Sequence, residues 1–167
     1  MRLTRLVLPA LLLAVPAIAS AEEPAAGAMQ LTDRQTFLLP IDEPGNRLPT
    51  YPEAVLAQQP IEGPRYVCMR VDLDAEGKVT WTGPIVREPE CPGITVLTKQ
   101  FADASVAALS TWRFEPATIC TFRTKSAKEA AGMSCQGGKE EPTPTSLTFR
   151  LLFEQSGGQG VVRMQRG

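Results

Sequence analysis

The sequence predicts a small two-layer α+β domain, in which a main helix and a short N-terminal helix cover one face of a three-stranded antiparallel sheet. Residues 65–74 and 146–154 alternate apolar and polar side chains, which is typical of strands with one buried face. Residues 99–112 instead repeat small and apolar side chains at helical spacing, which is typical of a helix that packs on a sheet.

The first 21 residues have the organisation of a secretory signal peptide. Arg2 and Arg5 precede a short apolar run, and the small residues at 19–21 are followed by two glutamates. The apolar run holds about 13 to 16 residues, whereas a membrane-spanning helix needs about 20. We therefore expect residues 1–21 to be removed on export to the periplasm, and a retained inner-membrane anchor is the alternative.

Composition excludes several classes of function. The chain has no histidine, and its 17 basic and 18 acidic residues show no basic stripe. Without histidine there is no Ser-His or Cys-His nucleophile pair and no histidine-bound metal. The four cysteines form no Cys-x-x-Cys pair that would indicate a zinc knuckle or a redox site. We expect no enzyme activity, no cofactor or metal, no small-molecule substrate and no binding to nucleic acid.

The N-terminal part of the predicted domain contains a helix and a hairpin. Residues 22–48 are rich in Pro and Gly without a sustained period, which predicts a linker or a loosely docked arm. A short helix should follow Pro52, because proline is tolerated at the first helical position. The strand at 65–74 leads through a turn at Gly77 into a second strand, whose buried face continues through Val79, Trp81 and Ile85.

The C-terminal part contains the main helix and the third strand. The helix at 99–112 should bury a stripe made of Leu97, Phe101, Ala104, Ala108 and Trp112. Pro116 ends this segment, and residues 118–145 form a polar insertion before the third strand. The tail at 155–167 is rich in glycine, which predicts a flexible segment.

An even number of cysteines in an exported chain indicates two disulfides. Three pairings are possible. We expect Cys120–Cys135, which closes the insertion, together with Cys68–Cys91, which joins the first strand to the loop after the second. Both disulfides would be structural.

Two polar groups invite a functional interpretation that their context does not support. Asp72, Asp74 and Glu76 resemble the start of a calcium-binding loop, but strands flank them where helices are required. Arg113 lies between two aromatic residues, where it can hydrogen-bond to the carbonyl groups at the end of the helix. We expect neither to be a ligand site.

Taken in order, residues 49–154 resemble the C-terminal domain of the TonB energy-transducer family. The resemblance depends on a Tyr-Pro pair before the first helix, a hairpin glycine, and a helix that ends in Trp-Arg-Phe-x-Pro-Ala. The matching residues are Tyr51, Pro52, Gly77, Trp112, Arg113, Phe114 and Pro116.

The resemblance implies a periplasmic protein-binding domain that adds a peptide strand, such as a segment of an outer-membrane transporter, to its sheet edge. The last strand of that family lies at the edge, so the implied binding positions are Ser146, Thr148, Arg150 and Leu152. A free edge would also allow two copies to pair as a homodimer.

The chain departs from the family in three ways. It lacks a long Pro-rich spacer, its N-terminal segment resembles a cleavable signal, and residues 118–145 replace a short link. Two alternatives stay open: a membrane-anchored energy transducer with a retained N-terminal helix, and a structural or interaction protein that uses its disulfide-closed insertion as a contact surface.

Overall fold

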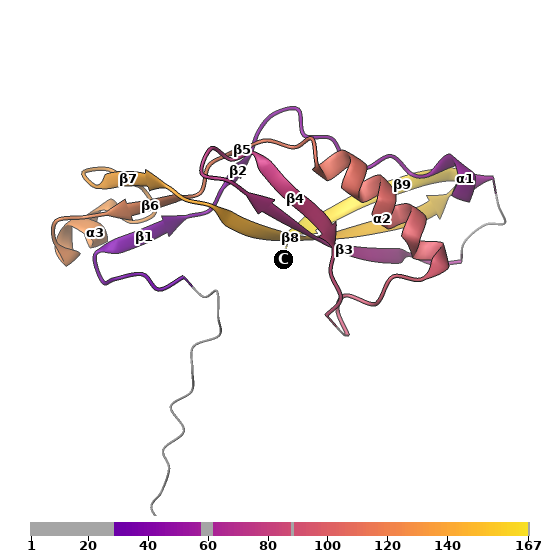
Figure 1. Cartoon of the computed structure of the whole chain (residues 1–167), viewed down its shortest axis with the longest axis horizontal. Coiled ribbons are helices and arrows are strands. Elements are labelled where there is room, and N and C mark those ends of the chain that lie inside the picture. Colours follow the sequence, from indigo (N-terminus) through magenta and orange to yellow (C-terminus); the bar gives the residue numbers. More distant parts are fainter. Residues whose placement is uncertain (1–28, 58–61, 88, 167) are drawn as a thin grey trace, which may run out of the picture. The chain divides into compact units, whose positions relative to one another are not determined.

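The computed structural model describes residues 29–57, 62–87 and 89–166, and all its elements lie within the compact unit Leu31–Gly167 (Figure 1). The predicted signal peptide lies outside the described residues. The helices are α1 (Glu53–Leu56), α2 (Val96–Leu109) and α3 (Lys125–Ala131). The strands are β1 (Gln35–Leu38), β2 (Ile41–Asp42), β3 (Arg65–Leu73), β4 (Val79–Pro84), β5 (Phe114–Glu115), β6 (Thr118–Thr121), β7 (Lys139–Pro142), β8 (Thr145–Ser156) and β9 (Gln159–Arg166).

The prediction of one small three-stranded sheet is wrong. The described residues form nine strands in three sheets, with the orders β1-β6-β7, β2-β5 and β4-β3-β8-β9. The three predicted strands are β3, β4 and β8, and the sheet gains a fourth strand because the tail folds back as β9. The predicted arm also contributes strands, since β1 pairs with β6 of the insertion and β2 pairs with β5.

The alternation predicted for β3 and β8 is confirmed. Their apolar side chains face α2 in one buried cluster with Phe101, Leu109 and Trp112. Figure 1 shows α2 lying across this sheet. The buried residues on this face of β3 and β8 are Val67, Met69, Val71, Leu73, Leu147, Phe149, Leu151 and Phe153.

The second strand does not bury Trp81, whose side chain is 49% exposed. A bulge between Asp72 and Leu73 shifts the register, so that Val79 opposes Leu73 while Trp81 opposes Asp72. Trp81 therefore lies on the face away from α2. Its ring covers Gly83, where any added Cβ would clash with it.

The main helix begins earlier and buries a different stripe than predicted. Thr95 and Thr98 form a capping box that starts α2 at Val96, with the Thr95 hydroxyl accepting from the Thr98 N–H at 3.2 Å. Only Phe101 of the predicted stripe is among the buried residues of the helix, which are Thr98, Phe101, Ala102, Ser105 and Leu109. Trp112 is buried as predicted, but it lies beyond the last helical residue.

The residues that follow α2 join the end of this helix to the turn at Gly77 and to the arm. The Phe114 N–H donates to the Gly77 carbonyl at 3.1 Å, and Gly77, with φ of +78°, packs against the Phe114 carbonyl so closely that no side chain fits there. Trp112 Nε1 donates to the Arg47 carbonyl at 2.9 Å. Asn46 bonds both backbone groups of Arg113, at 2.8 and 2.9 Å. The arm is therefore attached to the end of α2.

Candidate functional site

Strand β9 provides the longest open edge of the four-stranded sheet. A two-residue turn joins β8 to β9, and both of its residues, Gly157 and Gly158, have positive φ (60° and 77°), as a type I′ turn requires. Eight residue pairs follow, from Ser156 with Gln159 to Phe149 with Arg166. No strand among the described residues pairs with the other side of β9.

The hairpin geometry determines which backbone groups face this open edge. Ser156 and Gln159 flank a two-residue turn, so they form a pair that exchanges both hydrogen bonds. Every second residue of β9 from Gln159 then bonds to β8, and the residues between them point their N–H and C=O groups outward. Gly160, Val162 and Met164 therefore present the backbone groups that an added strand would bond.

The opposite edge of the sheet, β4, is a poorer acceptor of a strand. It has six residues and ends at Pro84, which has no N–H to donate. Its start is flanked by the backbone around Arg113, which forms a bridge with Lys78. Its short length, Pro84 and the neighbouring backbone thus limit β4, whereas β9 is open over its length in the part of the chain that is described.

The residues predicted to form the binding edge lie on an interior strand. Arg150 opposes Cys68 on β3 and Gln165 on β9, and Leu152 has neighbours on both sides as well. Ser146 and Thr148 lie before the β9 ladder begins, and pair with β3 alone. All four side chains lie on the face away from α2. The free edge of the sheet is therefore β9, one strand beyond the predicted edge.

The face away from α2 has a diagonal of three arginines, which we call the arginine face: Arg70 on β3, Arg150 on β8 and Arg163 on β9. Arg70 Nε lies 2.6 Å from Asp72 Oδ1, which also accepts from the Ser146 hydroxyl at 2.6 Å. Ser146 and Arg150, two of the residues predicted to form the edge, thus contribute polar and charged side chains to this face. Neither lies at a free edge of the sheet.

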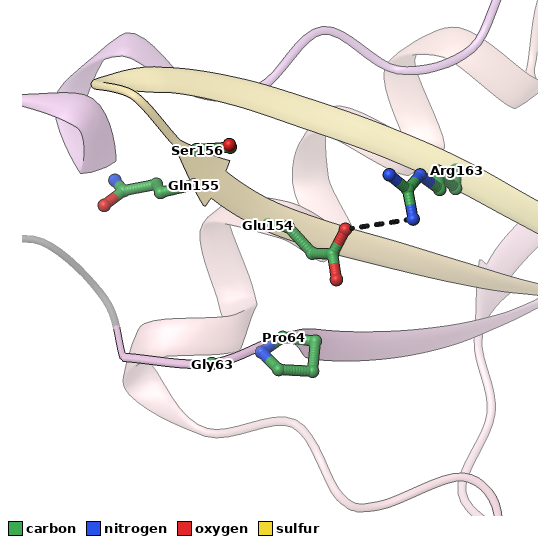
Figure 2. Close-up of a pocket in the computed structure, with 6 residues that line it drawn as sticks. All are labelled: Gly63, Pro64, Glu154, Gln155, Ser156 and Arg163. Carbon is green, nitrogen blue, oxygen red and sulfur yellow. Dashed lines mark ion pairs between the residues drawn. The ribbon is translucent and has the colours of Figure 1, made fainter.

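The end of this face near the hairpin contains a hollow of about 280 Å³ (Figure 2). Arg163 Nη1 and Glu154 Oε2, from neighbouring strands, line the hollow and form an ion pair at 3.4 Å. Gly63 and Pro64 lie on the opposite side, where the chain enters β3. Because the Arg163 side chain is 69% exposed, this pair contributes little to stability.

Tyr51, from the segment that resembles the family, lies directly over β9. A Cβ at Gly160 would clash with the Tyr51 ring, and the ring also contacts Phe101 and Phe153 edge-on at 5.3 and 6.1 Å. Burial raises the pKa of Tyr51, although a hydrogen bond with the Gln155 side chain opposes the shift. The segment before α1 thus helps to hold β9 in the sheet.

Sequence reasoning missed β9 because glycines in a tail suggested flexibility. The available signal was two adjacent glycines between apolar segments, which is typical of a tight hairpin. A second attachment could not be predicted: Arg166 Nη2 donates to the Pro40 carbonyl at 2.9 Å, which ties the end of β9 to the arm.

Both predicted disulfides, Cys68–Cys91 and Cys120–Cys135, are present. They indicate an oxidising, exported environment. Within the described ranges, no group of His, Cys, Asp and Glu side chains could hold a metal ion, and no helix is long and apolar enough to cross a membrane. Arg113 is exposed and donates to the Trp112 carbonyl at 2.9 Å, next to the end of α2.

Comparisons with models of protein families, with curated proteins and with solved structures find no match. The resemblance to the TonB family therefore depends on the residues named above.

Proposed function

We propose that this chain is a periplasmic protein-binding domain, similar to the C-terminal domain of TonB-type transducers, that recognises an extended peptide by adding it as a strand to β9. The peptide would belong to a protein involved in outer-membrane transport, as the family resemblance implies. The domain acts by binding and catalyses no reaction.

The observation that supports this proposal best is the open edge of β9. Eight consecutive residues, Gln159–Arg166, form a regular ladder with β8, and no other described strand pairs with them. Strand addition uses such an edge, because backbone hydrogen bonds provide affinity and alternate side chains provide selectivity. An added strand would have Val162 and Met164 on its α2 side, and Val161 and Arg163 on the arginine face.

Two further observations support the proposal. The residues that resemble the family form a connected structure, in which Gly77 contacts Phe114 and Tyr51 covers β9 at Gly160. The disulfides agree with an oxidising compartment such as the periplasm.

The test is an NMR titration of the mature protein with peptides from the N-terminal segments of outer-membrane transporters. We expect shifts of the backbone amides of β9, largest at Gly160, Val162 and Met164. A Val162→Pro variant removes one outward N–H and should abolish binding. Val162→Ala removes the same side chain but keeps the N–H, and should still bind.

The proposal is wrong if no transporter peptide shifts β9, or if Val162→Pro binds as well as Val162→Ala. The mass of the exported protein tests the alternative of an anchored transducer, since that alternative requires residues 1–21 to be retained.

A further inference from the structure

Arg150, at the centre of the arginine face, has no ion-pair partner among the described residues, unlike Arg70 and Arg163. Its guanidinium lies over the Tyr66 ring, 4.0 Å from the ring centre. Arg70 and Arg163 each form an ion pair, with Asp72 and Glu154. In the described part of the chain Arg150 has neither an ion pair nor a hydrogen bond, and its Nε is shielded from solvent without an acceptor.

Arg150 therefore has guanidinium N–H groups that donate to no acceptor among the described residues. A guanidinium can donate five hydrogen bonds, and it binds a carboxylate most strongly through two parallel ones. Because Nε has almost no accessible surface, a carboxylate that docks on Arg150 must bind through Nη1 and Nη2, and it displaces no water from Nε. The contact with the Tyr66 ring restricts the guanidinium, which lowers the entropy lost on binding.

The charges around Arg150 favour a partner with a single negative group. The ladder places Arg70 and Asp72 on one side of Arg150, and Arg163 and Glu154 on the other. Each flanking arginine forms an ion pair with its own carboxylate, whereas Arg150 forms none among the described residues. A polyanion such as a lipid surface would approach Asp72 and Glu154 as well, and like charges would repel it.

We propose that the arginine face docks a segment of a polypeptide partner that carries a single acidic residue, with this Asp or Glu side chain bound to Arg150 over Tyr66. The rest of the segment lies against Leu152, Thr148 and Gln165, which are half-buried or exposed and offer both apolar and hydrogen-bonding contacts. This site uses side chains on the face of the sheet, and it does not depend on strand addition at β9.

The test measures binding at Arg150 directly in the ¹⁵N-labelled mature protein. The probe is the capped pentapeptide Ac-Gly-Ala-Asp-Ala-Gly-amide, and the matched peptide has Asn in place of Asp. We expect the Asp peptide to shift the Nε–Hε resonance of Arg150 to saturation, while the Asn peptide does not. Arg150→Gln should weaken binding about tenfold or more, as loss of a charged hydrogen-bond partner predicts.

Arg123→Gln is the control, because it removes the same charge from an exposed position in the insertion and should bind like the unmodified protein. If Arg150→Gln does not fold, Tyr66→Leu tests the same site by removing the ring that holds the guanidinium. Equal shifts with the Asn peptide, no shift with either peptide, or equal weakening by Arg123→Gln would overturn the proposal. Binding to phosphatidylglycerol vesicles that needs Arg150, without binding to the Asp peptide, would replace the polypeptide with a lipid headgroup.

Discussion

Replacing Gly160 by alanine should destabilise the protein, although alanine normally stabilises a position at which its conformation is allowed. Gly160 lies on β9 beneath the Tyr51 ring. An added Cβ would fall 2.6 Å from Tyr51 Cδ2 and closer still to Cβ and Cγ, which are the least mobile atoms of that side chain. The ring is held on its other sides by Phe101 and Phe153, so it has no room to withdraw.

The magnitude follows from two opposing effects. An extra methyl group in a well-packed core costs about 1 to 3 kcal/mol. Alanine lowers the entropy of the unfolded chain, which returns about 0.4 to 1 kcal/mol. We therefore expect Gly160→Ala to lower the free energy of unfolding by about 1 to 2 kcal/mol, and the melting temperature by about 2 to 8 °C.

Urea denaturation followed by tryptophan fluorescence measures this change, because Trp112 is buried beside the same core. Gly93→Ala is the control, since a Cβ there meets nothing within 4 Å; we expect it to change stability by less than about 0.5 kcal/mol. In a Tyr51→Gly background the Gly160 substitution should cost almost nothing, because the Cβ, Cγ and Cδ2 atoms that cause the clash are all removed. The reasoning is refuted if Gly160→Ala is as stable as the unmodified protein, or if its cost is the same without the Tyr51 ring.

Three further substitutions test other parts of the structure. Burial raises the pKa of Tyr51 in the folded protein above its ordinary 10.0, so the unfolded chain loses this proton first as pH rises. The free energy of unfolding should therefore fall as pH rises past about 10. In urea denaturation between about pH 8 and pH 11, Tyr51→Phe should show a shallower fall than the unmodified protein. Asn46→Ala removes both hydrogen bonds to the backbone of Arg113 and should lower the free energy of unfolding by about 1 to 2 kcal/mol, while an unchanged denaturation midpoint would contradict a role for Asn46 in holding the arm. Replacing Cys120 and Cys135 by serine opens a disulfide that spans 15 positions and should lower the free energy of unfolding by about 3 kcal/mol. Proteolysis should then cut the insertion faster than in the intact protein.

The faces of the strands were predictable from sequence because their pattern is local. The alternation at 65–74 and 146–154 identified the buried faces of β3 and β8, and the positions of the cysteines relative to the predicted strands and the insertion led to both disulfide pairs. The exposure of Trp81 was not predictable, because a single bulge turns every later side chain of β4 to the other face. The period of the strand contains no sign of such a bulge.

The strands of the arm and the tail depend on partners that are distant in the sequence. β1 pairs with β6, which lies in the insertion, so the arm alone shows no pattern that identifies its partner. β9 was missed because the same two glycines that suggest flexibility also form the tight turn that returns the chain to β8. The predicted edge was therefore one strand away from the observed edge, although its four residues were placed together on one face.

The added strand separates two kinds of binding that the prediction had combined. Without β9, Arg150 and Leu152 would lie at the edge, where backbone groups and side chains would contact one partner. With β9 in place, the backbone edge lies at Gln159–Arg166, and Arg150 lies inside the face. The two surfaces should differ in their response to salt. The Debye length is about 8 Å at physiological ionic strength, and charge pairing weakens further as salt is added. Backbone hydrogen bonds at a sheet edge are much less affected by salt. A salt titration of each probe therefore distinguishes the surfaces: binding of the Asp peptide at Arg150 should fall steeply, and the shifts of β9 amides with a transporter peptide should persist.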